Sequence, residues 1–429
     1  MSQTRPTGMP PGMDEVARLT RAGRLAEATG LIQRLLRGEG ATDPAAAPAA
    51  APGPTVPDPT VLEGEFVRLD SAPGSQARSD TQDPARSAGK MAGSRSGMGA
   101  RTGLGETLRG LAARLRPTGL RGGGTGAPRP PAEPLPDGAS FTTASHSGAA
   151  GTRAYKLYVP ANRGDGLRPL VVMLHGCTQS PDDFAAGTRM NAFAERHGVY
   201  VAYPEQPASA NAQRCWNWFK PEDQRHGQGE PDLLAGITRR IIQDHPIDPN
   251  RVYIAGLSAG GAAAAIMGEA YPDLYAAVGV HSGLPAGAAH DLPSALAVMR
   301  QGDRGPMGKA GTGRAGTGQP TPTIIFHGDR DTTVHPRNGD QVAARAVAAA
   351  AGVGTEVQHG EVPGRRSYSR TLHTDPSGRT LCELWAIHGA GHAWAGGSPT
   401  GSYTDPQGPD ATAEMMRFFL EHQLRPASA

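Results

Sequence analysis

Large side chains are confined to the last two-thirds of this chain, and this uneven distribution limits where a folded core can form. Residues 1–138 contain a single aromatic residue, Phe66, and no histidine or cysteine. The other 20 aromatic residues, all 14 histidines and all three cysteines follow from Phe141 onward. Because burial of large apolar groups must offset the entropy lost on folding, the first third cannot build a core of ordinary size. We therefore expect an extension, residues 1–137, followed by one large domain, residues 138–429.

Two short segments of the extension have apolar residues at helical spacing, near residues 14–37 and 101–116. The remainder is rich in Pro, Ala, Gly and Ser, which is typical of a flexible linker, so we expect a mostly disordered extension. Residues 86–129 contain nine basic residues and a single acid, Glu106. Two interpretations of the helical segments stay open: weakly ordered solvated helices, or a docking element for an anionic surface or a partner.

The charge and hydropathy of the whole chain exclude several kinds of protein. A formal net charge of +2 gives no overall attraction to nucleic acid, so no nucleic-acid partner is expected. No run approaches the roughly 18 apolar residues that a membrane-spanning helix needs. The N-terminus lacks the basic start and apolar stretch of a secretory signal, so we expect a cytoplasmic protein. Three cysteines are too few, and odd in number, for a scaffold built on disulfides.

Within residues 138–429, short apolar runs alternate with segments of helical periodicity. Residues 169–176 form a continuous apolar run, as in a strand that is covered on both faces of a parallel sheet. This alternation predicts an α/β fold whose mainly parallel sheet carries helices on both faces, with reactive groups at the C-terminal ends of the strands. A glycine-rich insertion, residues 303–320, is predicted to be a surface loop. The expected strands are 152–160, 169–176, 199–204, 251–256, 275–283, 322–328 and 381–389, and the main expected helices are 182–198, 231–246, 339–352 and 411–424.

One serine has the local sequence of a catalytic nucleophile. Residues 256–260 read Gly-Leu-Ser-Ala-Gly, which fits the G-x-S-x-G pattern of a nucleophile elbow. In a chain with 59 glycines this pattern can arise by chance. Its setting between an expected strand and an expected helix, however, is the one that an elbow requires. We therefore predict that Ser258 is the nucleophile of a serine hydrolase, and the alternative is a glycine-rich turn without chemistry.

A serine nucleophile needs a base and an acid that orients the base, and in this fold they follow in the order Asp or Glu, then His. Asp331 follows the expected strand 322–328 and is predicted to be the acid. Asp329 competes with it, because it can simply cap the turn. His392 lies in the loop after the last expected strand and is predicted to be the base. His388 lies within that strand and is more typical of a sheet histidine.

The negatively charged oxygen of the reaction intermediate requires two N–H donors. One is predicted to be the backbone N–H of Ala259, because it starts the helix after the nucleophile. The other is assigned to the backbone N–H of Cys177, in the loop after the expected strand 169–176. The thiol of Cys177 is not needed as a nucleophile, since Ser258 has that role.

Five blocks of sequence together resemble the esterases of the poly(3-hydroxybutyrate) (PHB) depolymerase family. The similarity spans about residues 138–424 and implies an α/β-hydrolase fold with a Ser258–Asp331–His392 triad. It also implies ester hydrolysis without a cofactor or a metal, on hydroxyalkanoate polyesters or oligomers, or alternatively on feruloyl or acetyl esters of plant polysaccharides. The blocks are LHGCTQ (174–179), RCWNWF (214–219), GLSAGG (256–261), HGDRDTTV (327–334) and GAGHAWAGG (389–397).

This resemblance leaves several alternatives open. Many members of the family are secreted, so an extracellular location stands beside the cytoplasmic one. The extension is a candidate for holding the enzyme on a polymer granule. A remote alternative is a non-catalytic surface-binding protein that keeps the fold.

Two further sets of residues are predicted to lie near the site. Trp216, Trp218 and Trp394 either form an apolar wall around the ester or pack in the core. Cys177 and Cys215 are predicted to be close in space. They would be reduced in the cytoplasm and joined by a disulfide after export.

Overall fold

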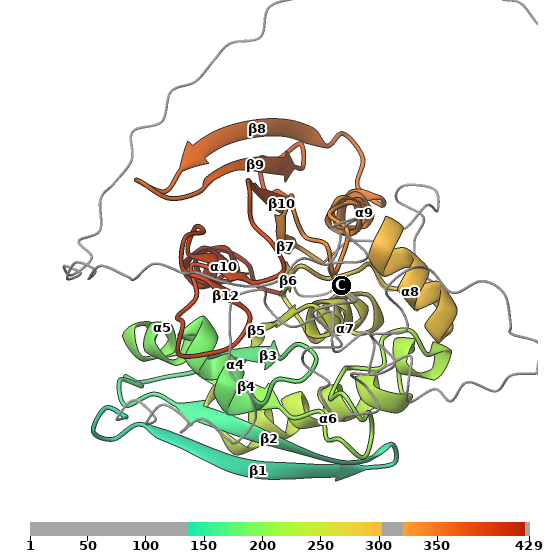
Figure 1. Ribbon diagram of the computed structural model, residues 1–429. Helices are drawn as coiled ribbons and strands as arrows, with labels where there is room; N and C mark the ends of the chain where they lie inside the picture. Colours follow the sequence, from blue (N-terminus) through green and yellow to red (C-terminus); the bar gives the residue numbers. More distant parts are fainter. Residues whose placement is uncertain (1–134, 303–320, 425–429) are drawn as a thin grey trace, which may run out of the picture. The chain divides into compact units, whose positions relative to one another are not determined.

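The computed structural model describes residues 135–302 and 321–424 (Figure 1). The expected helices near 14–37 and 101–116, and the glycine-rich insertion 303–320, lie outside these residues. The described part contains a ten-stranded sheet with the order β1-β2-β4-β3-β5-β6-β7-β10-β9-β8. These strands are β1 (Ser140–Gly148), β2 (Gly151–Val159), β3 (Arg168–Leu174), β4 (Tyr200–Pro204), β5 (Ile247–Leu257), β6 (Ala277–His281), β7 (Thr323–Gly328), β8 (Gly354–Glu361), β9 (Ser367–Thr374) and β10 (Thr380–Ile387).

The centre of the sheet is parallel and its two edges are antiparallel. Strands β4, β3, β5, β6, β7 and β10 pair in parallel with their neighbours. At one edge β2 pairs antiparallel with β4 and β1, and at the other edge β9 pairs antiparallel with β10 and β8. The predicted α/β fold with a mainly parallel sheet is therefore confirmed.

Strand β3 shows why the sheet is covered on both faces. Its side chains alternate between two hydrophobic cores: Leu170, Val172 and Leu174 contribute to one core, and Val171 and Met173 to the other. All five side chains are fully buried. A strand without a polar residue at any of these positions is stable only when both of its faces are covered.

Two groups of helices provide this cover (Figure 1). The first core contains side chains of α6, α7, α8 and α9, and the second contains side chains of α4, α5 and α10. No helix among the described residues is both long enough and apolar enough to cross a membrane. The helices are α4 (Pro181–Thr188), α5 (Met190–His197), α6 (Gly229–Asp244), α7 (Ala259–Ala270), α8 (Leu292–Gln301), α9 (Arg337–Val347) and α10 (Ala411–Leu420), with a short 3₁₀ helix η1 (Pro221–Gln224) and two short paired strands, β11 (Trp394–Ala395) and β12 (Thr404–Asp405).

The single helix predicted over residues 182–198 is wrong, because two helices occupy this stretch. Helix α4 ends at Thr188, and α5 begins at Met190. Arg189 between them has a φ of 55°, in the left-handed region. The Arg189 side chain donates hydrogen bonds to the carbonyl oxygen of Gly396 (3.0 Å) and to Asp410 (3.1 Å). These contacts join the break to residues more than 200 positions away, and Gly187 lies two residues before Arg189 in the last turn of α4.

Some elements were not predicted at all, namely β1, β8, β9 and α8. Most side chains of β1 and β8 are exposed, and most of β9 are only partly buried. In α8 only Ala295 is buried. Strands β1, β8 and β9 lack the apolar pattern by which a strand is recognised in a sequence. Helix α8 does have apolar residues at helical spacing, Leu292, Ala295, Leu296 and Met299, but it was not predicted.

Candidate active site

Ser258 lies in the sharp turn between β5 and α7. Its backbone has φ 59° and ψ −119°, a conformation that residues other than glycine rarely adopt. Two hydrogen bonds hold the turn: the Ser258 N–H donates to the carbonyl oxygen of His281 (2.9 Å), and the Ser258 carbonyl accepts from the N–H of Ala262 (2.9 Å). The turn places the serine at the N-terminus of α7 with 8% of its surface exposed.

The two glycines of the G-x-S-x-G motif are required by close backbone contacts. A Cβ atom on Gly256 would lie 2.3 Å from the carbonyl carbon of Gly260. A Cβ atom on Gly260 would lie 2.1 Å from the carbonyl oxygen of Leu174 at the end of β3. Any larger residue would therefore push α7 away from β3 and open the turn that presents Ser258.

The acid and base candidates are joined by a hydrogen bond. Asp331 follows β7, and His392 follows β10, the strand that pairs with β7. The Nδ1 atom of His392 lies 2.7 Å from Oδ2 of Asp331. The other carboxylate oxygen accepts the backbone N–H groups of Thr333 and Val334, each at 2.8 Å. Both oxygens of Asp331 thus have partners, and its side chain is fully buried.

The surroundings of Asp331 keep its carboxylate charged. Burial by itself would raise the pKa of Asp331, but the imidazoles of His392 and His327 outweigh burial and hold that pKa well below its usual range. A charged carboxylate accepts but does not donate, so the hydrogen on the ring of His392 is on Nδ1. The Nε2 atom of His392 then has the free lone pair that a base needs.

The three predicted residues follow strands whose C-terminal ends meet at one edge of the sheet. Ser258 follows β5, Asp331 follows β7 and His392 follows β10, and these strands are separated in the sheet only by β6. Within the described residues, no hydrogen bond joins Ser258 Oγ to His392. Such contacts commonly tighten only when substrate is bound.

The competing residues form a separate pair. Asp329 Oδ2 lies 3.0 Å from His388 Nδ1, and Asp329 Oδ1 accepts the N–H of Gly389 at 2.8 Å. Neither Asp329 nor His388 therefore replaces its neighbour in the Asp331–His392 pair.

The loop that carries Cys177 lies directly against Ser258. A Cβ atom on Gly176 would be 3.6 Å from Cβ of Ser258. Among the described residues, neither the N–H of Cys177 nor that of Ala259 donates to a protein acceptor, and the first N–H groups of a helix have no intrahelical acceptor. The structure thus places two free N–H groups in the segments that flank the serine.

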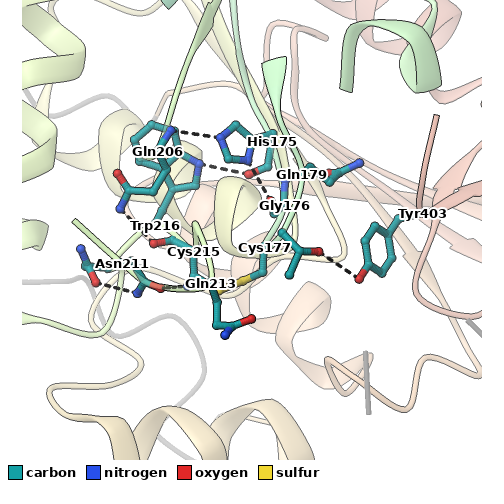
Figure 2. Close-up of a disulfide and its surroundings, with 12 residues drawn as sticks. His175, Gly176, Cys177, Gln179, Gln206, Asn211, Gln213, Cys215, Trp216 and Tyr403 are labelled. Atoms are coloured by element: carbon teal, nitrogen blue, oxygen red, sulfur yellow. Dashed lines mark hydrogen bonds between the residues drawn. A yellow bond between two sulfur atoms is a disulfide. The ribbon is translucent and has the colours of Figure 1, made fainter. Parts of the chain in front are cut away.

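A disulfide holds this loop in place. Cys177 and Cys215 are bonded, with their Cα atoms 4.2 Å apart, which confirms the prediction that they lie close in space (Figure 2). The Thr178 N–H donates to the carbonyl oxygen of Gln213 (2.7 Å), and Trp216 Nε1–H donates to that of His175 (3.0 Å). The loop after β3 is thus joined to residues 213–216 by one covalent bond and two hydrogen bonds.

Two buried ionisable residues support this arrangement, and neither was predicted to have a role. His175 Nε2 accepts the N–H of Gln206 at 3.1 Å (Figure 2), and burial lowers the pKa of His175 to about 4. Glu230 accepts hydrogen bonds from the N–H and the side chain of Asn217, each at 2.8 Å. Burial, followed by the charge of Asp223, raises the pKa of Glu230 to about 7. His175 and Glu230 are recognised only once the fold brings their remote partners together.

The three tryptophans lie in the core. Trp216, Trp218 and Trp394 are 0%, 6% and 1% exposed. The Nε1–H of Trp394 donates to Thr412 Oγ1 at 3.0 Å, inside the second core. The sequence left two interpretations open, an apolar wall around the ester or packing in the core. In the structure all three side chains pack in the core and expose almost no surface to a substrate.

Metal ligands do not cluster in the part of the chain that the structure describes. In residues 135–302 and 321–424 no group of three or more His, Cys, Asp or Glu side chains is arranged so that it could hold a metal ion.

Residues 153–356 match the sequence pattern of the family described as Esterase PHB depolymerase. This part of the chain belongs to the esterase PHB depolymerase family. The matched segment includes Cys177, Ser258 and Asp331 and ends before His392.

Curated relatives and a solved structure agree with this membership. The family domain is similar to a protein named poly(3-hydroxyalkanoate) depolymerase C of Paucimonas lemoignei, with 34% identity over 54% of this chain and 56% of the relative. It is also similar to feruloyl esterase B of Thermothelomyces thermophilus, with 31% identity over 43% of this chain and 66% of the relative. The chain thus spans less than two-thirds of the length of either relative. An acetyl xylan esterase from Aspergillus awamori superposes with a TM-score of 0.52 at 20% identity, over 65% of this chain and 99% of that one, which shows a shared α/β-hydrolase fold.

Proposed function

We propose that this chain is a carboxylic ester hydrolase in which Ser258 is the nucleophile, His392 the base and Asp331 the acid that orients the base. The observation that carries this proposal is the 2.7 Å hydrogen bond between His392 Nδ1 and the buried Asp331 carboxylate, at the same edge of the sheet as the strained turn of Ser258. A buried carboxylate on Nδ1 leaves Nε2 of the imidazole free to accept a proton from a serine.

The proposed reaction has two halves. In the first, Ser258 Oγ forms a bond to the ester carbonyl carbon while His392 Nε2 takes the hydroxyl proton. The carbonyl oxygen becomes negatively charged and accepts the N–H groups of Ala259 and Cys177. The C–O bond of the ester then breaks, and the alcohol leaves with the proton from His392. In the second half water repeats these steps, which releases the acid and regenerates the serine.

As substrates we propose hydroxyalkanoate polyesters or their oligomers. The support is that a depolymerase is among the relatives, with 34% identity. The alternative is a feruloyl or acetylated polysaccharide ester, supported by the similarity to a feruloyl esterase. Turnover of a 3-hydroxybutyrate trimer, methyl ferulate and acetylated xylan decides between them, with Ser258→Ala as the blank. Faster turnover of the trimer is expected, and a preference for either of the other two esters would favour the alternative.

We also propose that residues 1–137 direct the enzyme to a polymer granule or another anionic surface. The support is the excess of basic residues between 86 and 129. A chain that starts at Gly138 is expected to match the full chain on a soluble ester and to be slower on an insoluble polyester. This difference is expected to shrink at high salt. Equal rates on the polyester at every salt concentration would contradict the proposal.

For the location we propose an oxidising compartment, in place of the cytoplasm expected from the sequence. The support is the Cys177–Cys215 disulfide, since disulfides persist mainly in such compartments. One reactive thiol, that of the free Cys382, is expected in denatured protein isolated from its natural source under alkylating conditions. Three thiols would contradict this location.

A further inference from the structure

A second hydrogen-bonded Asp–His–Ser set lies beside the candidate active site. It consists of Asp329, His388 and Ser369. Asp329 Oδ2 is 3.0 Å from His388 Nδ1, and His388 Nε2 is 2.9 Å from Ser369 Oγ. The carboxylate contacts Nδ1 and the serine contacts Nε2, which is the arrangement of a nucleophile, its base and the acid that orients the base.

The fold brings these residues together at one edge of the sheet. Asp329 follows β7, His388 follows β10, and Ser369 lies on β9, where it pairs with Ala386 of β10 and with His359 of β8. The Asp329 side chain is fixed by the N–H of Gly389, which donates to Oδ1 at 2.8 Å.

The hydrogen-bond partners allow the arrangement of protons that a nucleophile and its base require. When His388 is neutral, its Nδ1–H donates to the Asp329 carboxylate, and its Nε2 has the lone pair that can accept the hydroxyl proton of Ser369. Ser369 Oγ also lies 3.0 Å from Nδ1 of His359. Because Ser369 has only one proton, His359 is the donor in that contact when Ser369 donates to His388.

The second set is far more accessible than the first. The side chains of Asp329 and His388 are each 42% exposed, whereas those of Asp331 and His392 are 0% and 9% exposed. Ser369 is partly exposed. A small electrophile can therefore approach Ser369 from solvent.

The second set also lacks two features of the first. Ser369 lies in a strand flanked by β8 and β10, so it has neither a strained turn nor free N–H groups at the start of a helix. Without such donors a negatively charged intermediate is poorly stabilised. Only acyl donors with a good leaving group are expected to react, and slowly compared with Ser258.

We propose that Ser369 is a second reactive serine of this protein, which accepts the acyl group of small activated esters such as aryl esters. Ser369 Oγ forms a bond to the carbonyl carbon while His388 Nε2 takes the hydroxyl proton. The bond to the aryl oxygen breaks, and the phenol leaves with the proton from His388. The products are an O-acyl serine and a free phenol.

The test uses the full chain with Ser258→Ala, so that acylation of Ser258 is absent. The protein is incubated with p-nitrophenyl acetate at pH 7.5, and acetylated peptides are located and quantified over time by mass spectrometry. We expect acetylation of Ser369 at a rate that falls at least about tenfold when His388→Ala or Asp329→Asn is added. Adding Ser369→Ala is expected to abolish it.

Ser367, exposed on the same strand, provides the matched control. Ser367→Ala is expected to leave the rate at Ser369 unchanged. Two results would overturn the proposal: acetylation of Ser369 no faster than that of Ser367, or acetylation that continues at the same rate without His388. In either case the three residues would serve only to fasten β9 to the loops after β7 and β10.

Discussion

His392 Nδ1 and the Asp331 carboxylate, 61 positions apart in the sequence, are joined by a 2.7 Å hydrogen bond. This contact connects the loop after β7 to the loop after β10 and fixes both the orientation of the imidazole and the position of its proton. The Asp329–His388 pair joins the same two loops, with 3.0 Å between Asp329 Oδ2 and His388 Nδ1. Asp329 lies two residues before Asp331, and His388 lies four residues before His392. The two Asp–His pairs are therefore similar in geometry, and substitutions in each pair can distinguish their roles.

Asp331→Asn is expected to lower kcat on a soluble nitrophenyl ester by about 10³–10⁴-fold, since an amide no longer holds the imidazole in the required tautomer. Asp329→Asn is the matched control and is expected to change kcat by less than about tenfold. Both variants should unfold cooperatively at temperatures near that of the parent. Equal losses of kcat in the two variants would contradict the assignment of the acid to Asp331.

Cys215→Ser is expected to destabilise the protein by about 2–4 kcal/mol, because it removes a cross-link that closes a loop of intermediate length. It should also lower kcat more than it raises KM, because the N–H of Cys177 is no longer held beside Ser258. Urea unfolding and steady-state kinetics measure the two effects. Reduction of the parent with dithiothreitol should cause the same loss of stability and the same loss of kcat. It should cause no further loss of either in Cys215→Ser. A parent that keeps full kcat after complete reduction would show that the disulfide does not position this N–H.

Stability is expected to depend on pH through His175. Burial lowers its pKa to about 4 in the folded protein, whereas an unfolded histidine has a pKa of about 6.5. The unfolded chain therefore binds the proton first, and the stabilisation present above pH 6.5 is lost as the pH falls toward 4. The free energy of unfolding by urea, measured from pH 7 to pH 4, should fall less steeply in His175→Gln than in the parent. Parallel profiles would show that His175 does not titrate in this range.

The sequence allowed the main elements and the candidate triad to be placed because each has a local pattern. Strand β3 is apolar from Pro169 to Leu174, and the glycines around Ser258 are required by the turn itself. Asp331 and His392 were predicted to be the acid and the base because each follows a buried strand, and because they come after Ser258 in the chain order Ser, Asp, His that this fold uses. Their hydrogen bond agrees with that expectation, and their catalytic roles stay predictions.

Other features depend on contacts that no local pattern encodes. At the break, Arg189 contacts Gly396 and Asp410, and the burial of Glu230 is seen only once its partners at Gln206 and Asn217 are in place. The exposed edge strands β1 and β8 lack apolar alternation, so their pairing could not be predicted. For a tryptophan such as Trp216, the neighbouring residues do not distinguish a core position from a substrate wall.

The turnover of Ser258→Ala on a soluble ester, measured together with its melting temperature, tests directly whether Ser258 is the nucleophile. We expect a loss in kcat of at least about 10⁴-fold with an unchanged fold, as is usual when a triad nucleophile is removed. A variant that melts like the parent and keeps a tenth of its activity would contradict the assignment of Ser258 as the nucleophile.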